Sequence, residues 1–288
     1  MNGEYMPLSE GHVGMEDRSV LFGDAIYEVI AAYNGTPLLM DEHLDRWERS
    51  ADGIRIPQRH SRERRIDVIT ELLRQFESPN AMVYGQLSRG YARRAHQFPL
   101  NPNPTEFWWV RELPKYIPAM YTDGVSVYTH PDERWARCWV KSTNLIANCM
   151  AKQFAHERGA FEAVLYREDG IITEGAAANF HVVKDGEVYT HPLDGRILGG
   201  CKRILLLEIA RSLGITVREQ KFTVPFLREV DEAFLTSTTI NLLPVTKCDD
   251  IAVGNGMVGK VTDRLMDAMR SEIKRRCQQP ASLLSGVK

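Results

Sequence analysis

The sequence predicts a two-domain protein in which β-strands and α-helices are mixed. The chain has 288 residues, which is enough for two domains of ordinary size. Segments whose apolar residues alternate, as in a strand, interleave with segments of helical spacing. Residues 113–119 contain Pro114 and Pro118 and are the best candidate for a linker. We therefore expect a smaller N-terminal α/β domain over residues 1–116 and a larger C-terminal domain over residues 117–288.

The first part of the chain is expected to form a hairpin followed by a helix. Asn34-Gly35 separates two apolar stretches, a strong signal for a tight turn between antiparallel strands. The helix is expected to begin after residue 41 and to end at Gly53, and Arg46 lies beside its apolar stripe. The residues of that stripe are Leu44, Trp47 and Ala51.

The same patterns predict the remaining elements. Further helices are expected at residues 61–76, 145–157, 203–213 and 261–277. Further strands are expected at residues 81–88, 107–110, 125–129, 138–140, 163–167, 179–183, 188–190 and 232–235. Residues 278–288 have no periodicity, so we expect a frayed tail.

The charge balance excludes several classes of partner. The 36 lysines and arginines nearly balance the 38 acidic residues. The chain as a whole therefore has no positive electrostatic field that would hold nucleic acid or anionic lipid nonspecifically. Apolar runs are short, and the start of the chain has neither the basic nor the apolar region of a secretory signal. We expect a cytoplasmic protein that binds no nucleic acid and no membrane.

The cysteines predict thiols in a reducing compartment. Their number is odd, they are widely spaced, and none belongs to a motif with metal-ligand spacing. We therefore expect no bound metal. The five residues are Cys138, Cys149, Cys201, Cys248 and Cys277.

Lys141 is the candidate for lysine chemistry. No lysine precedes Lys115, so such chemistry is expected in the second domain. Residues 138–140 before Lys141 are apolar, and residues 142–144 after it can cap a helix. An amine at a strand end in a partly dry cleft would have a lowered pKa, as a nucleophile needs. The alternative is an ordinary solvated lysine at the end of a strand.

Glu174 is the second candidate. In the segment GIITEGAAANF it is expected in a turn between apolar stretches, followed by small residues that allow a flat or bulky group to approach. A buried ligand explains this pattern. The alternative, which the local sequence favours, is a hairpin with an exposed glutamate and small residues that serve only packing.

Two segments could together hold a phosphate group. ILGGCKR stands before a predicted helix, whose first N–H groups attract anions, and TSTT at residues 236–239 ends a strand with hydroxyls. The spacing of a P-loop is absent. Each segment alone is more often only a turn or a cap.

Arg94 and His96 are candidates for binding a carboxylate. They are two residues apart in RRAHQFP, so in an extended loop their side chains point the same way. The alternative is a solvated basic loop. The other histidines considered have no partner pattern and are interpreted as surface or structural residues: His43, His60, His130, His156 and His191.

These motifs follow one another in an order that resembles a known family. The order is Y-E-V, D-E-H-L-D-R, R-G-x-x-x-R-x-H-x-F-P, K-S-x-N-L, T-E-G-x-x-x-N, a Gly-rich turn and T-S-T-T. It resembles the fold-type IV pyridoxal-phosphate enzymes, and among them it is most similar to the D-amino acid aminotransferases. The similarity extends from about residue 2 to the last predicted helix. It implies a two-domain fold with the cofactor in the cleft between the domains.

The resemblance implies roles for the candidate residues. Lys141 would form the internal aldimine and move a proton between the substrate Cα and C4′ of pyridoxal 5′-phosphate. Glu174 would pair with the pyridinium nitrogen and keep it protonated, so that the ring can take up electrons. Leu198 would pack against the ring. The residues implied in phosphate binding are Arg46, the turn at residues 200–202 with Cys201 and Lys202, Ser237 and Thr238.

One position departs from the family pattern. Lys202 occupies a place in the phosphate turn that is usually threonine, so a hydroxyl contact is lost. Whether the charge of Lys202 replaces that contact stays open. The resemblance further implies that Tyr27, Arg94 and His96 bind the substrate carboxylate and reach the active site from the neighbouring subunit of a homodimer.

The implied reaction is a ping-pong transamination. A D-amino acid such as D-alanine would donate its amino group, and a 2-oxo acid such as 2-oxoglutarate or pyruvate would then accept it. The R-x-H pair favours D-amino acids. The alternatives are a branched-chain L-amino acid aminotransferase, an aminodeoxychorismate lyase, and a non-catalytic protein that binds a phosphate ligand.

Overall fold

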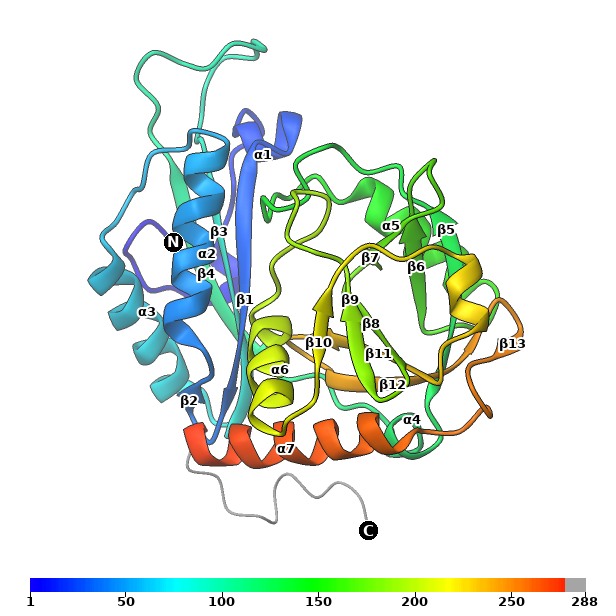
Figure 1. Cartoon of the computed structure of the whole chain (residues 1–288). Coiled ribbons are helices and arrows are strands. Elements are labelled where there is room, and N and C mark those ends of the chain that lie inside the picture. Colours follow the sequence, from blue (N-terminus) through cyan, green and yellow to red (C-terminus); the bar gives the residue numbers. More distant parts are fainter. Residues whose placement is uncertain (278–288) are drawn as a thin grey trace. The chain divides into compact units, whose positions relative to one another are not determined.

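The computed structural model describes residues 1–277, so the expected tail at residues 278–288 lies outside the described residues (Figure 1). The expected mixture of strands and helices is confirmed. By its contacts the chain forms two units, one of Met1–Pro114 with Val140–Leu145 and one of Lys115–Trp139 with the chain from Ile146 onward. The domain boundary that the sequence places near residue 117 stays a prediction.

The N-terminal unit contains a four-stranded antiparallel sheet with the strand order β2-β1-β3-β4. Helices α2 and α3 pack on one face of this sheet (Figure 1). Its strands are β1 (Ala25–Tyr33), β2 (Thr36–Pro37), β3 (Asn80–Ser88) and β4 (Thr105–Glu112). Its helices are η1 (Leu8–Glu10), α1 (Arg18–Phe22), α2 (Met40–Gly53) and α3 (Arg62–Gln75).

The predicted hairpin and the predicted apolar stripe of α2 are both confirmed. Asn34 and Gly35 have φ angles of 53° and 73°, as the two central residues of a tight hairpin turn require. All three stripe residues of α2 are fully buried. Trp47 of that stripe stacks on Trp108 of β4 with ring centroids 4.7 Å apart. Packing of this aromatic pair fixes α2 on the sheet.

The segment Val140–Leu145 belongs by its contacts to the N-terminal unit. It pairs along the edge of β1, because Tyr27 N donates to Lys141 O (2.9 Å) and Thr143 N donates to Ala25 O (3.0 Å). The expected strand at residues 138–140 is wrong, since these residues form a turn. A run of three apolar residues suits a buried turn as well as a strand. Lys141 was expected in the second domain, but by its contacts it belongs to the first unit.

The C-terminal unit is built on a curved nine-stranded sheet (Figure 1). The order among the described residues is β10-β9-β8-β11-β12-β5-β6-β7, with β13 paired to β12. Three pairs are parallel, namely β9 with β10, β12 with β5, and β5 with β6. The strands are β5 (Val125–Pro131), β6 (Glu162–Tyr166), β7 (Ile172–Gly175), β8 (Asn179–Lys184), β9 (Glu187–Thr190), β10 (Val217–Glu219), β11 (Glu232–Ser237), β12 (Asn241–Cys248) and β13 (Ile251–Ala252).

Helices cover the central strands of this sheet. Helices α6 and α7 pack on each other and on β11, and α5 packs on β5 and β6. The central strands β8 and β11 are buried almost throughout, and their buried polar residues include Asn179 and His181 of β8 and Thr236 of β11. The helices are α4 (Ala119–Thr122), α5 (Ile146–His156), α6 (Cys201–Ser212), η2 (Pro225–Arg228) and α7 (Lys260–Cys277). Within residues 1–277, no helix is both long and apolar enough to span a bilayer.

Candidate active site

Lys141 and Tyr27 lie together in the N-terminal unit. Lys141 Nζ is 4.2 Å from the centroid of the Tyr27 ring. The main chain of Lys141 is fixed on both sides, because its N donates to Ser50 Oγ (3.1 Å) and its O accepts from Tyr27 N. The amine therefore extends from a rigid segment at the edge of β1. Tyr27 reaches this amine within one chain, which differs from its expected origin in a neighbouring subunit.

Arg46 is buried and paired with an acidic residue that the sequence analysis missed. Arg46 Nε and Nη2 donate to the two carboxylate oxygens of Glu28 at 2.7 and 2.8 Å. His43 Nδ1 lies 2.7 Å from Glu28 Oε2, so His43 is a buried structural residue whose acidic partner no sequence pattern indicated. Burial alone would raise the pKa of Glu28, but Arg46 and His43 outweigh burial and lower it. The two-point contact with Glu28 fixes the plane of the Arg46 guanidinium.

Arg94 and His96 lie on the loop that follows β3, and both side chains are exposed. Figure 1 shows this loop extending beyond the ends of β3 and β4. The Arg94 guanidinium is 5.3 Å from the centroid of the Phe22 ring, and the His96 ring is 5.6 Å from it. The two side chains thus share one aromatic contact, and they are available to bind an anion.

Glu174 lies in the C-terminal unit, in strand β7 and not in a turn, and only 4% of it is exposed. The alternative of an exposed hairpin glutamate is therefore wrong. Glu174 Oε1 accepts hydrogen bonds from Arg134 Nη1 (2.6 Å) and Leu198 N (3.0 Å). Oε2 accepts one from Asn179 Nδ2 (2.8 Å). A carboxylate offers about four lone-pair positions, so Oε2 has room for a further N–H donor.

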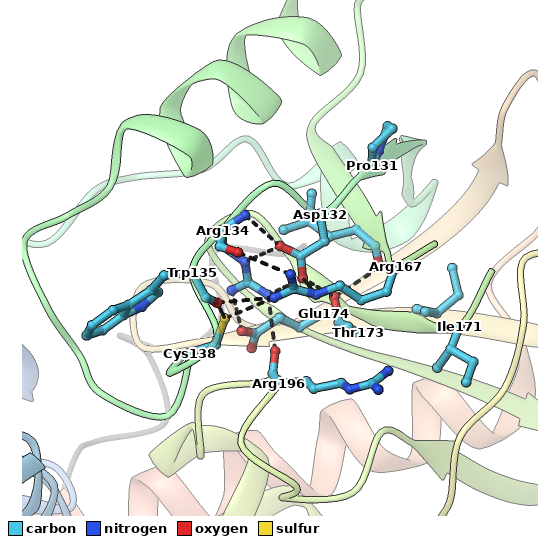
Figure 2. A network of polar contacts seen from close by, with 12 residues as sticks. Pro131, Asp132, Arg134, Trp135, Cys138, Arg167, Ile171, Thr173, Glu174 and Arg196 are labelled. Carbon is cyan, nitrogen blue, oxygen red and sulfur yellow. Dashed lines mark hydrogen bonds and ion pairs between the residues drawn. The ribbon is translucent and has the colours of Figure 1, made fainter. Parts of the chain in front are cut away.

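Arg134 links Glu174 to a second buried carboxylate (Figure 2). Its Nε and Nη2 each donate to Asp132 at 2.9 Å. Asp132 also accepts from Thr173 Oγ1 and faces Arg167 Nε at 3.1 Å. Burial raises the pKa of Glu174, and the charge of Arg134 opposes that rise. The cluster therefore holds a carboxylate in a dry place without leaving it isolated.

The turn before α6 lies beside this cluster. Asn179 Nδ2 donates to Leu198 O as well as to Glu174, and a Cβ added to Gly200 would come within 2.0 Å of Asn179 Oδ1. Only glycine allows this approach. Asn179 also pairs with Thr236 of β11, so the start of α6, the end of β11 and Glu174 gather around one amide. Of the further candidates, Ser237 ends β11, Thr238 follows it, and Leu198 is half-buried.

Lys202 and Cys201 belong to the first turn of α6, which begins two residues earlier than expected. Gly200 is the N-cap and provides no side-chain hydrogen bond. The side chains of both residues are buried, and burial lowers the pKa of Lys202 to about 7. The amine of Lys202 is therefore inside the protein at the start of this helix.

The structure thus collects the candidates into separate groups. Lys141 and Tyr27 are in contact, Arg94 and His96 share Phe22, and Arg46 lies on α2. Glu174, Leu198, the turn at residues 200–202 and the end of β11 are gathered in the C-terminal unit.

The residues that sequence analysis missed are the pairing partners of these candidates. Glu28 stands in the quoted Y-E-V motif and Asn179 in T-E-G-x-x-x-N, so the motifs contained a signal for both. Asp132 and Arg134 stand in no quoted motif. Their part in the site became visible only through their contacts.

The chain matches a known family over most of its length. A family model described as amino-transferase class IV matches residues 25–248. A D-alanine aminotransferase of Staphylococcus haemolyticus is 38% identical over 279 residues, which cover 96% of this chain and 98% of that relative. A D-alanine aminotransferase of Bacillus licheniformis is 38% identical over 274 residues, 94% of this chain and 95% of the relative.

Solved structures of the same architecture are also found. A branched-chain amino acid aminotransferase of T.th., solved with pyridoxamine 5′-phosphate, superposes with a TM-score of 0.87 at 26% identity, over 99% of this chain and 95% of that chain. The branched-chain enzyme of Escherichia coli has a TM-score of 0.86 at 24% identity, over 92% and 91%. At that identity the second likeness concerns the fold alone.

Proposed function

This chain belongs to the amino-transferase class IV family, and from this premise we propose that it moves the amino group of D-amino acids such as D-alanine to 2-oxo acids such as 2-oxoglutarate or pyruvate. The relatives named D-alanine aminotransferase support the choice of D-amino acids, because they resemble the chain over nearly its whole length. The solved branched-chain enzymes have the same fold, so the branched-chain L-amino acid alternative has to be tested as well. The cofactor of this family is pyridoxal 5′-phosphate, in keeping with the pyridoxamine 5′-phosphate of the solved relative.

The observation that carries the proposal is the buried carboxylate of Glu174. A protonated pyridine nitrogen is an N–H donor, and Glu174 Oε2 accepts only one hydrogen bond within the described residues. Arg134 donates to Glu174 and opposes the rise in its pKa that burial causes, which favours the anionic form of the carboxylate. When bound, the cofactor accepts the amino group and takes up the electrons of the breaking Cα–H bond. Leu198 would cover the ring.

Lys141 would hold the cofactor aldehyde and move the proton at the substrate Cα. Its main chain is fixed by Ser50 and Tyr27, so Nζ swings from a defined point. Nζ faces the ring of Tyr27. The π-system of an aromatic ring attracts an ammonium group but takes no proton from it. An amine held in this way can exchange a proton within a short radius.

The phosphate would be bound by charged groups, backbone N–H groups and hydroxyls. Arg46 presents a guanidinium whose plane Glu28 fixes, and a planar fork suits phosphate oxygens. The turn at residues 200–202 precedes a twelve-residue helix whose N-terminal dipole end favours anions. Ser237 and Thr238 add hydroxyls. An anion near Lys202 would favour its charged form over the neutral one that burial favours.

The substrate carboxylate would be bound by Tyr27, Arg94 and His96. The exposure of Arg94 and His96 in a single chain supports a homodimer in which this loop serves the partner's active site. The test mixes Arg94→Ala subunits, expected to be weakly active alone, with Lys141→Ala subunits, expected to be inactive alone. Hybrid dimers should regain part of the activity, since one site then has both intact residues. A mixture that stays inactive contradicts the shared site.

The proposed substrate choice is tested with donors of both hands. The protein loaded with pyridoxal phosphate is given D-alanine or L-leucine with 2-oxoglutarate, and the oxo acid product is measured. We expect turnover of D-alanine and little or none of L-leucine. The opposite result would assign the chain to the branched-chain L-amino acid alternative. We further propose that the protein is cytoplasmic, which the odd number and wide spacing of its cysteines support.

A further inference from the structure

The loop that carries Arg94 and His96 is held at its base by a buried arginine. Arg18, the first residue of α1, is only 3% exposed. Its Nη1 donates to Ala95 O at 2.7 Å, and longer contacts of 3.4 Å reach Gln97 O and His96 O. A single guanidinium therefore contacts three successive carbonyls, which include those on both sides of His96.

Asp24 fixes the direction of the Arg18 guanidinium. Arg18 Nε donates to Asp24 Oδ2 at 2.7 Å. The same carboxylate accepts two hydrogen bonds from Arg89, at 2.8 and 3.0 Å. Arg89 in turn donates to Ile54 O and Arg55 O, directly after α2. The loop is thus connected through Arg18, Asp24 and Arg89 to the core of the N-terminal unit.

The same arginine supports the functional side chains through one ring. The Arg18 guanidinium lies 4.7 Å from the centroid of Phe22, four residues further along the chain. Phe22 is also the ring that Arg94 and His96 contact. Arg18 therefore determines both the main-chain path at residues 95–97 and the position of the surface on which the two side chains rest.

We propose that Arg18 is a positioning residue that sets the geometry of the carboxylate-binding pair Arg94 and His96. This inference rests on the proposed function of that pair. Lysine cannot replace arginine here, because only the planar fork offers donors to Asp24 and to the loop carbonyls at the same time. Arg18 itself touches no substrate in this proposal and acts through the loop alone.

The test compares Arg18→Lys with Arg93→Lys, a matched control in the same loop at an exposed arginine. The loaded enzyme is mixed with D-alanine in single-turnover experiments, which give the apparent Kd of the donor and the maximal rate separately. We expect Arg18→Lys to raise the Kd about tenfold, as expected for loss of one good hydrogen bond. The maximal rate and the cofactor absorbance spectrum should change less than twofold, and Arg93→Lys should behave as the wild type.

A combined variant separates positioning from a general structural role. If Arg18 acts only through the pair, then adding Arg18→Lys to the double variant Arg94→Ala/His96→Ala should weaken D-alanine binding no further than the double variant does alone. Independent, multiplying effects would overturn the proposal, as would an Arg18→Lys variant with the Kd of the control. If Arg18→Lys fails to fold, Asp24→Asn removes the charge that directs Arg18, and the same rise in Kd is expected.

The outcomes also separate this inference from the proposed function. A wild-type enzyme that turns over D-alanine, with an Arg94→Ala variant that binds it weakly, supports the role of the loop whatever Arg18 does. An Arg94→Ala variant with an unchanged Kd would overturn both the role of the loop and that of Arg18. A wild-type enzyme that binds the cofactor but does not turn over D-alanine would contradict the proposed substrate class.

Discussion

Replacing Arg134 by methionine removes the cation that joins two buried carboxylates. In the wild type, Arg134 donates twice to Asp132 and once to Glu174, and its side chain is 9% exposed. Methionine fills much of the same volume but offers no donor. Arg167 still faces Asp132 at 3.1 Å, so Glu174 is the carboxylate left with neutral donors only.

The expected loss of stability is large because the remaining charge stays buried. Removing one partner of a buried ion pair typically costs about 3–5 kcal/mol. The retained contacts of Glu174 with Asn179 and Leu198 place the expected loss in unfolding free energy near the lower end, about 3 kcal/mol. Arg196→Met is the matched control, since Arg196 pairs with Asp169 where both side chains are about two-fifths exposed. An exposed pair contributes about 1 kcal/mol at most.

The difference between wild type and Arg134→Met should depend on pH. Burial raises the pKa of Glu174, and without Arg134 nothing of comparable strength opposes that rise. The folded variant then binds a proton that the unfolded chain releases, so its stability increases as pH falls from 7 towards 5. In the wild type the pKa of Asp132 is lowered, because its charge partners outweigh burial. The stability that ionised Asp132 contributes is therefore present at both pH 7 and pH 5, and it is lost only below about pH 4.

Urea denaturation at pH 7 and pH 5 measures both effects. The unfolding free energy of Arg134→Met should be lower than that of the wild type by about 3 kcal/mol at pH 7 and by clearly less at pH 5. The unfolding free energy of Arg196→Met should be close to that of the wild type at both pH values. A loss at pH 7 no larger than that of Arg196→Met would refute the reasoning. So would a loss that stays constant or grows as pH falls.

Three further predictions concern Lys202, Trp47 and Gly200. Lys202→Met should stabilise the cofactor-free protein at pH 7 by a few kcal/mol, on the order of 3–5 at 1.36 kcal/mol per pKa unit, because burial lowers the pKa of Lys202 from 10.5 to about 7. The folded wild type binds fewer protons than the unfolded chain between those values, so this gain should shrink as pH rises towards 10, as urea denaturation can check. Trp47→Ala should cost about 3–5 kcal/mol in thermal or urea unfolding, since the ring is fully buried against Trp108. Gly200→Ala should weaken binding of pyridoxal phosphate, measured by absorbance titration, because the added Cβ would displace Asn179.

The parts of the fold that sequence predicted well are those with local causes. The turn at Asn34 and Gly35 follows from backbone preferences at two adjacent residues, and α2 follows from apolar spacing with a period near 3.6. Neither needs knowledge of a distant segment. The candidate functional residues were found mainly through the order of family motifs, which sequence carries without geometry.

The parts that sequence missed depend on distant partners. Residues 138–140 are apolar enough for a strand, but pairing with β1 begins only at Lys141, which no local pattern indicates. Glu174 looked like a turn residue because Gly175 follows it, yet it pairs with Arg134, forty residues earlier. The partnership of Arg46 with Glu28 likewise joins a helix to a strand. Such ion pairs are set by tertiary packing.

The central claim is that the amine at position 141 carries the cofactor. The full chain is incubated with pyridoxal phosphate, reduced with borohydride, digested and analysed by mass spectrometry. We expect a phosphopyridoxyl group on the peptide that contains Lys141, and no such label in Lys141→Ala. A label confined to another lysine, such as Lys202, or no stable label at all, would contradict it.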